Sequence, residues 1–303
     1  MKTILAYISV FFVLISAPKK GYGQLVPIYS QYLVNQAVLN PAYAGANNCL
    51  NLTALYRQQW SNLQGAPSTR TLSAHTPLKN RSWAIGMNVV NDVAAITSNT
   101  LVEALFAYRV RITKRHKLSL GIGAGLFINK NNLSSIKVND SGDEVFANNQ
   151  NSTLPTFSFG AYFENKKYFL GISALNLNRN LLHPPTFVYQ QPYYFIAGYH
   201  YKCSDLVTLS PSVLVKKITN NPFQFDFNLF LTYNKQFKLG ASYRTNDAAY
   251  MVLLFQLNDQ LQIGYSYDYA LSALRPFQNG THEISVRYLF QYKTQTVDVK
   301  TFQ

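Results

Sequence analysis

The sequence predicts an all-β protein, a transmembrane antiparallel β-barrel of the outer-membrane type with about 14 strands and an N-terminal hatch or plug segment. Aromatic residues make up 15% of the chain, with 22 Tyr and 20 Phe, whereas charged residues make up only 13%. A soluble domain carries about 25% charged residues. After the first 23 residues, no apolar run reaches the roughly 20 residues that a spanning helix requires. An exported chain with this composition fits a barrel whose strands cross the membrane.

Residues 1–23 have the features of a cleaved signal peptide, which implies export. Lys2 precedes an apolar stretch from Ile4 to Ala17, and small residues stand at Gly21 and Gly23. The apolar stretch is too short for a spanning helix. No cysteine follows it directly, so we expect no lipid anchor there.

Residues 24–49 are predicted to form the hatch or plug. Their centre is the run Asn40, Pro41, Ala42, Tyr43, Ala44 and Gly45, within QYLVNQAVLNPAYAGA. Pro41 lacks a backbone donor and biases the residue before it away from helical geometry, so the run cannot be a regular helix. A plain linker would not need so many apolar residues. We therefore expect a compact, irregular element before the first strand.

Residues 50–292 are predicted to be the barrel. In 263–269, Ile and Tyr residues alternate with Gly, Ser and Asp. A period of two places the two sets on opposite faces of one strand. A soluble sandwich would also alternate, but its apolar face would be more often aliphatic than rich in Tyr. The predicted strands are 50–60, 67–77, 81–92, 97–112, 115–130, 153–164, 167–176, 190–202, 206–217, 222–234, 236–245, 248–258, 260–270 and 281–292.

The connections between these strands support the same fold. Every second connection is short: 78–80, 113–116, 164–167, 203–205, 234–236 and 258–260. The interleaved connections include the long ones: 131–152, 176–189 and 270–280. Outer-membrane barrels have short turns on the periplasmic rim and long loops on the outer rim. Residues 293–303 form a polar tail that we expect to protrude into the periplasm.

The predicted inward face collects charges of both signs, and two interpretations stay open. The residues are Arg57, Asp226, Arg244, Asp268, Glu283 and Arg287. They can pair with one another and fill the lumen. Alternatively, this network docks the Asn40-Pro41-Ala42 element as a plug. The glycines of 121–125 lie within a strand pattern and predict close packing against luminal side chains.

The sequence contains no arrangement of residues that indicates an enzyme, a metal site or a cofactor site. No nucleophile stands in a recognisable relation to a base, and only His75, of five histidines, lies in a phase that could face the lumen. Cys49 and Cys203 are far apart and fit no metal or redox spacing, so we expect free thiols. The net charge is +14, of which Lys2, Lys19 and Lys20 contribute three. Because an exported chain seldom meets nucleic acid, this charge favours outer-membrane lipid or an acidic partner.

Several motifs together resemble the PorP/SprF family of the type IX secretion and gliding machinery in Bacteroidota outer membranes. They are QYLVNQAVLNPAYAGA, LYRQQW (55–60), LSAHTPL (72–78), LGASYRT (239–245), IGYSYDY (263–269) and GTHEISVRYL (280–289). The resemblance implies a barrel that assists secretion or surface anchoring of a partner with a gliding-type C-terminal sorting domain. Periplasmic proteins of the secretion machinery are further implied partners. It implies no catalytic residues and no cofactor.

Two other functions remain as alternatives. A fatty-acid-transporter-like barrel for small apolar ligands also has an N-terminal hatch with an Asn-Pro-Ala sequence. A general diffusion porin ranks after it, because a hatch would close such a pore. The sequence does not distinguish a core component of the machinery from an accessory dedicated to one partner.

Overall fold

A computed structural model describes residues 27–79, 81–135, 148–177, 190–219 and 221–290. The predicted signal peptide (1–23) and polar tail (293–303) lie outside the described residues, as do parts of the predicted long loops 131–152 and 176–189. Within the described ranges, no helix is long and apolar enough to cross a membrane.

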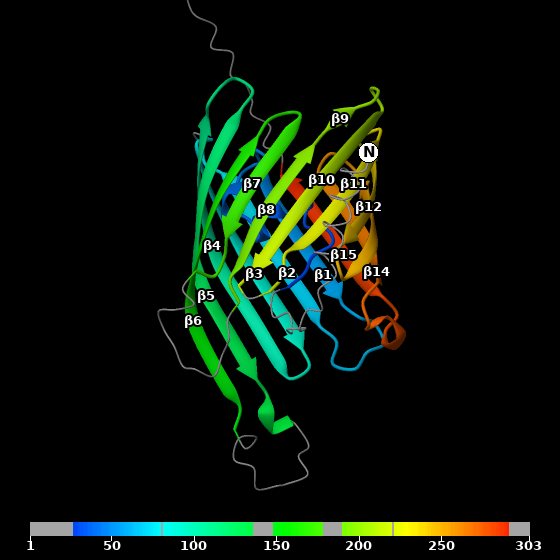
Figure 1. Cartoon of the computed structure of the whole chain (residues 1–303). Helices are drawn as coiled ribbons and strands as arrows, with labels where there is room; N and C mark the ends of the chain where they lie inside the picture. The colour runs from blue at the N-terminus through cyan, green and yellow to red at the C-terminus, as the bar shows by residue number, and fades with distance from the viewer. Residues whose placement is uncertain (1–26, 80, 136–147, 178–189, 220, 291–303) are drawn as a thin grey trace, which may run out of the picture.

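The described chain forms one antiparallel sheet that closes on itself (Figure 1). Its segments are β1 (Leu50–Gln58), β2 (Ser68–Pro77), β3 (Trp83–Ala94), β4 (Thr97–Arg111), β5 (Lys117–Asn131), β6 (Gln150–Glu164), β7 (Tyr168–Ala174), β8 (Pro192–Tyr199), β9 (Tyr201–Lys202), β10 (Val207–Ile218), β11 (Gln224–Tyr233), β12 (Phe237–Arg244), β13 (Ala248–Gln256), β14 (Leu261–Ala270) and β15 (Thr281–Phe290). β1 pairs with β15, and β10 pairs with β11, which completes the ring.

β8 and β9 are two parts of one strand. Gly198 opposes Ser212 and Lys202 opposes Thr208 on β10, so the register does not change across His200. The barrel therefore has 14 strands, which confirms the predicted antiparallel all-β barrel and its strand number. Most strand ends lie within a few residues of the predicted ones. β6 begins earlier than predicted, at Gln150, because it continues to pair with the polar end of β5.

The side chains of each strand alternate between lumen and exterior. On β15, Glu283 is 0% exposed and points inward, whereas Ile284 is 53% exposed and points outward. Large apolar side chains are exposed in the same way around the whole barrel, as expected for a surface that faces lipid. Most of the buried side chains of the strands that point into the lumen are polar.

The two rims of the barrel differ. The short-turn rim carries connections 78–82, 112–116, 165–167, 203–206, 234–236 and 257–260. The long-loop rim carries the remaining connections, including 132–149, 175–191 and 271–280. In Figure 1 the short-turn rim is at the top and the long-loop rim is at the bottom. Short helical turns lie in two of these loops, η3 (Leu133–Ser135) and η4 (Arg275–Phe277).

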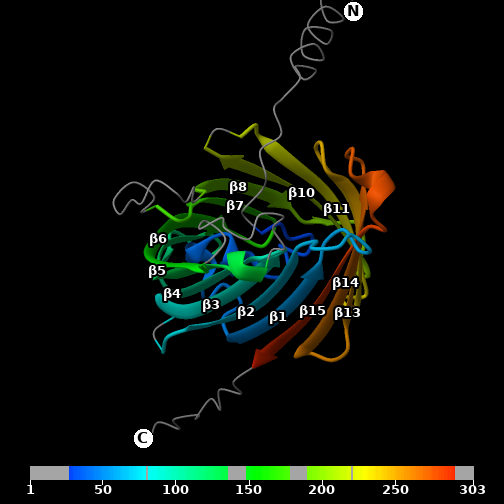
Figure 2. The ribbon, with the colours of Figure 1, turned by 90° about the horizontal axis from the view of Figure 1, so that it is seen from below.

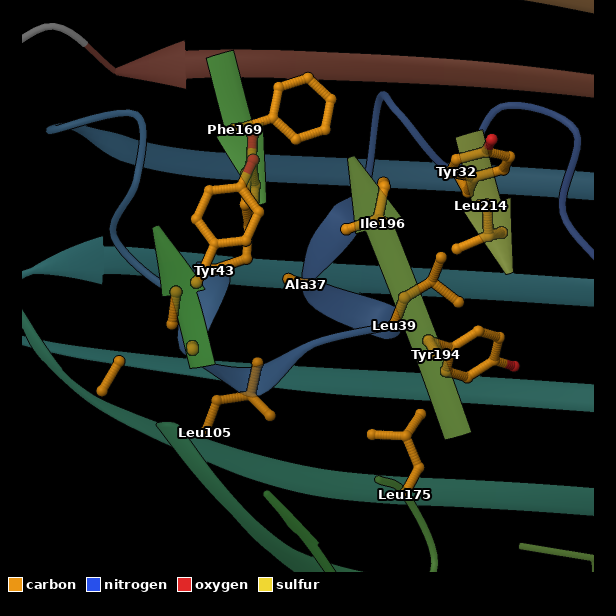
Figure 3. Packing of buried hydrophobic residues seen from close by; sticks show 14 of the residues in the cluster. Tyr32, Ala37, Leu39, Tyr43, Leu105, Phe169, Leu175, Tyr194, Ile196 and Leu214 are labelled. Atoms are coloured by element: carbon orange, nitrogen blue, oxygen red, sulfur yellow. The ribbon is translucent and has the colours of Figure 1, made fainter. Parts of the chain in front are cut away.

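Residues 27–49, which we call the N-terminal segment, lie inside the ring of strands (Figure 2). Two single-turn 3₁₀ helices, η1 (Gln36–Val38) and η2 (Pro41–Tyr43), form its only helical structure within the described range. Its apolar side chains pack against inward-facing residues of the barrel wall. Figure 3 shows Tyr32, Leu39 and Tyr43 of this segment beside side chains of β4, β7, β8 and β10.

Candidate functional site

The N-terminal segment runs along the lumen from the long-loop half to the short-turn rim. Ser30 contacts Glu283, which lies near the long-loop end of β15. Asn40 contacts Ala161, which lies near the short-turn end of β6. The segment then leads directly into β1 at the short-turn rim.

Five of the six predicted luminal charges lie together, and we call them the charge cluster: Arg57, Asp226, Arg244, Asp268 and Glu283. Arg57 pairs with Asp268 at 2.8 Å and with Glu283 at 2.9 Å. Arg244 pairs with Asp226 at 2.9 Å and lies 3.7 Å from Asp268. All five residues are at most 3% exposed. Buried charges of this kind need complete pairing, since removal of one partner leaves an uncompensated ion.

Arg287, the sixth predicted residue, lies apart from the charge cluster. It is four residues beyond Glu283 on β15, toward the short-turn rim. Within the described part of the chain it forms no ion pair, and its buried Nε has no hydrogen-bond partner. The alternation of β15 therefore placed it on the correct face but at a different level of the lumen.

The charge cluster holds the backbone of residues 29–31. The Glu283 carboxylate accepts hydrogen bonds from the backbone N–H groups of Ser30 (3.0 Å) and Gln31 (2.7 Å). Arg244 donates to the carbonyl oxygen of Tyr29 at 3.0 Å. The Ser30 hydroxyl donates to Asp268 at 2.6 Å and accepts from Arg57 at 2.8 Å. The backbone N–H and C=O groups of an irregular segment lack the partners that a helix or a sheet would provide. Side chains of the barrel supply those partners here.

The Gln31 side chain continues this attachment along β15. Its Nε2 donates to the carbonyl oxygen of Glu283 at 2.8 Å, and its Oε1 accepts from the Ser285 hydroxyl at 2.6 Å. Tyr29 and Tyr32 place their hydroxyl groups against Thr71 and Asn228. Burial raises the pKa of both tyrosine hydroxyls, which therefore remain neutral.

Asn40, Pro41 and Ala42 lie close against the wall at three glycines on adjacent strands. We call Gly121 (β5), Gly160 (β6) and Gly171 (β7) the glycine seat. A Cβ atom at Gly121 would overlap the backbone of Pro41 and Ala42, and one at Gly160 would overlap the Asn40 side chain. Strand glycines commonly mark the close approach of another backbone.

Asn40 joins the segment to the wall and also organises η2. Its Nδ2 donates to the carbonyl oxygens of Ala161 (3.0 Å) and Ile172 (3.1 Å) on β6 and β7. Its Oδ1 accepts from the backbone N–H of Ala42 at 2.9 Å, as an N-cap does. Pro41 fits the first position of η2, where no backbone donor is needed. The predicted irregular element therefore has a defined geometry.

Tyr43 and Gly45 meet the wall nearer the short-turn rim. The Tyr43 ring lies edge-on to His75 (5.8 Å between centroids) and to Tyr162 (5.2 Å). The Gly45 N–H donates to Nδ1 of His75 at 3.0 Å, and Arg109 donates to the Gly45 carbonyl oxygen. Gly45 has φ +74°, and a Cβ there would lie 2.5 Å from that of Ala84. His75 thus contacts the N-terminal segment in the lumen.

Several contact residues were not predicted from the sequence. Asn35 donates to Ser73 at 2.8 Å, and Asn88 donates to the carbonyl oxygen of Ala37 at 2.9 Å. Ser73 and Asn88 lie on the inward face of β2 and β3, so the alternation could have identified them. Gly160 and Gly171 are isolated glycines within strand patterns, a signal for a close backbone approach. Ser30 and Gln31 gave no such signal.

The geometry of this region is suited to holding a chain segment. Among the described residues, no group of three or more His, Cys, Asp or Glu side chains could hold a metal ion. The buried hydrogen-bonding groups are directed at backbone and side-chain atoms of residues 29–45. Both free cysteines, Cys49 and Cys203, lie outside the charge cluster and the glycine seat.

Solved structures with a similar fold are outer-membrane barrels and channels. Omp33 of Acinetobacter baumannii has 7% identity and a TM-score of 0.50, with 80% of this chain and 98% of that chain covered. The monoaromatic hydrocarbon channel CymD has 11% identity and a TM-score of 0.50, covering 90% and 96%. A FadL homologue of Pseudomonas aeruginosa has 12% identity and a TM-score of 0.46, covering 89% and 96%. At these identities the likeness shows the fold alone.

No curated protein gives a significant match. The family model described as "Type IX secretion system membrane protein PorP/SprF" matches residues 22–288. This range includes the N-terminal segment and nearly the whole barrel. Fold and family together make the protein an outer-membrane protein. The chain belongs to the PorP/SprF family of type IX secretion system membrane proteins.

Proposed function

We propose that this protein is an outer-membrane component of, or an accessory to, the type IX secretion and gliding machinery. It assists secretion or surface anchoring of a partner with a gliding-type C-terminal sorting domain. The main support is the family match over residues 22–288. After removal of the signal peptide, the long-loop rim faces the exterior and meets the secreted partner. The short-turn rim faces the periplasm, where proteins of the secretion machinery dock.

We propose further that the N-terminal segment is a plug that keeps the barrel closed to solutes. Both ends of the described segment are attached to the wall, Ser30 and Gln31 at the charge cluster and Asn40 at the glycine seat. One hollow between this segment and the wall, beside Tyr29 and Lys216, has about 20 Å³, which is room for one water molecule. A barrel that holds a chain segment in its lumen in this way is better suited to holding partners at its rims than to passing a substrate through its lumen.

Gene deletion combined with purification tests the secretion role. We expect that deletion abolishes secretion or surface attachment of one or more proteins with the sorting domain. We also expect such a protein, or a periplasmic component, to co-purify with the tagged barrel from detergent. The proposal is wrong if secretion and surface attachment are unchanged after deletion. An Ala104→Trp strain is a suitable control, because Ala104 is exposed on the outer face of β4.

The alternative is a transport barrel for small apolar ligands. This alternative is considered because the barrel shares its fold with the hydrocarbon channel CymD, with a TM-score of 0.50. It predicts an apolar molecule in the purified protein and no secretion defect on deletion. Mass spectrometry of organic extracts from the purified barrel separates the two functions.

A further inference from the structure

A basic hollow lies at the short-turn rim, beside the hairpin that joins β9 to β10. Its volume is about 490 Å³. Four of its lining residues occupy inward positions of the wall: His200, Lys202, Thr208 and Thr232. Thr208 opposes both Lys202 on β9 and Thr232 on β11, and it continues the inward series of the buried Ser210 on β10. These positions belong to the lumen side of the sheet, so the hollow opens toward the aqueous mouth of the barrel and not toward lipid.

Lysines from three connections surround the basic hollow. They are Lys166 and Lys167 in the turn after β6, Lys202 at the end of β9, and Lys235 in the turn after β11. Among the described residues, Lys202 alone of these four has an ion pair, with Asp205 at 2.5 Å. Four lysines and one aspartate leave an excess of positive charge in the lining.

Unpaired cations continue from the basic hollow into the lumen. Lys238 on β12 opposes Thr232, and its Nζ lies over the Phe230 ring at 4.8 Å. Lys238 is repelled by Arg287 and in turn repels His200, so the three groups share one part of the lumen. Within the described ranges, neither Lys238 nor Arg287 forms an ion pair, and the buried Nε of Arg287 has no hydrogen-bond partner.

This half of the lumen differs from the charge cluster in the other half. In the charge cluster, both Arg57 and Arg244 pair with carboxylates of the wall. Around Lys238 and Arg287 the wall supplies no such carboxylate. Partly buried cations without counter-ions are costly, and an anionic ligand would remove that cost. The hydroxyl groups of Thr208 and Thr232 are further donors for such a ligand.

We infer that the basic hollow binds an acidic segment of a periplasmic protein, whose carboxylates pair with Lys167, Lys235 and Lys238. The inference rests on the proposed function, which places the short-turn rim in the periplasm. The hollow, at about 490 Å³, lies within the range of ligand pockets, about 300–1,000 Å³. Cations on several connections and strands suit an extended polyanion better than a single small anion. The tail of this chain, 291–303, carries two lysines and one aspartate, so its charge does not match the hollow.

Fluorescence anisotropy with the full-length barrel in a non-ionic detergent tests this inference. The probe is a fluorescein-labelled polyglutamate peptide, and a polyglutamine peptide of equal length is the neutral comparison. We expect saturable binding of polyglutamate alone, weakening as the salt concentration rises. The double variant Lys167→Gln, Lys235→Gln should weaken binding by about threefold per lysine. Lys238→Gln should also weaken it, because the segment enters the mouth of the lumen.

Matched controls separate the basic hollow from the general charge of the rim. The double variant Lys79→Gln, Arg81→Gln removes the same charge from the turn between β2 and β3 and should bind as the unmodified protein does. Thr208→Phe fills the hollow without a change of charge and should weaken binding, whereas Thr208→Val should retain most of it. Heat-modified gel mobility identifies the folded variants, and only these are compared.

Three results would overturn the inference. They are binding of both peptides alike, equal losses in the site and control double variants, and displacement of the probe by inorganic phosphate as effectively as by unlabelled polyglutamate. The last result would make the hollow a site for small anions. A secretion defect on gene deletion without polyglutamate binding would overturn this inference and leave the proposed function intact. Binding that depends on the hollow, without a secretion defect, would support the site and contradict the proposed function.

Discussion

Arg57 is the residue on which the charge cluster depends most directly. It pairs with both Asp268 and Glu283, and all three are almost completely buried. Substitution Arg57→Leu leaves two carboxylates without their main cation, so we expect a loss of about 3–5 kcal/mol in the free energy of unfolding. Urea titration followed by gel mobility measures it. Lys114→Gln in an exposed turn is the control, and an equal effect of both variants would contradict the prediction.

Gly160 tests the close approach in the glycine seat. A Cβ atom at Gly160 would overlap the Asn40 side chain, so Gly160→Ala should destabilise the barrel by about 1–3 kcal/mol and loosen the N-terminal segment. Asn40→Ala creates space at the same point. The double variant should therefore be more stable than the sum of the two single effects predicts. Thermal unfolding of the four proteins measures this coupling, and strict additivity would show that the two residues act independently.

At the level of residues, the sequence predicts which face of a strand a side chain lies on better than it predicts which residues that side chain contacts. The alternation of β14 and β15 identifies Asp268 and Glu283 as inward-facing, and charge complementarity makes Arg57 a reasonable partner. The same alternation cannot give the level of a residue in the lumen, so it does not separate Arg287 from the charge cluster. Gly160 has no side chain to reveal its partner. Its role depends on where residues 40–42 lie, which only the fold determines.

The N-terminal segment is the element whose removal should have the largest effect on permeability. It occupies the lumen between the charge cluster and the glycine seat, so deletion of residues 31–46 should raise single-channel conductance. Planar bilayers provide the measurement. Deletion of residues 272–276 in the loop before β15 serves as the control, because it shortens the long-loop rim and removes no residue of the N-terminal segment. A barrel that stays closed after the first deletion would show that the N-terminal segment is not the plug.

The strands were predictable as elements, but the conformation of the N-terminal segment was not. A period of two with Tyr and Phe on one face is a strong signal, because each strand has lipid on one side and a polar lumen on the other. Pro41 correctly excluded a regular helix through 40–45, and the structure has only the single turn η2 there. The turns themselves follow from hydrogen bonds to the barrel, such as those of Asn40 and Gln31. Local sequence does not contain that information.

At the scale of the whole molecule, the pairing of the first and last strands closes the barrel. The 14 antiparallel strands bring β1 beside β15 and leave no free edge, and the long connections all lie on one rim. The asymmetry of the rims also predicts the orientation in the membrane. The two native cysteines can report this orientation, because Cys203 is exposed at the short-turn rim and Cys49 is buried.

Thiol labelling of intact cells with a membrane-impermeant maleimide should therefore leave this protein unmodified. Cys203 faces the periplasm in the proposed orientation, and burial raises the pKa of the Cys49 thiol, which lowers its reactivity. Permeabilisation of the outer membrane should make Cys203 reactive, and Cys203→Ser should abolish that signal. In the Cys203→Ser background, Ala273→Cys in the exposed loop before β15 should react in intact cells. Labelling of Cys203 without permeabilisation would reverse the orientation, and the long-loop rim would then have to meet periplasmic partners instead of secreted ones.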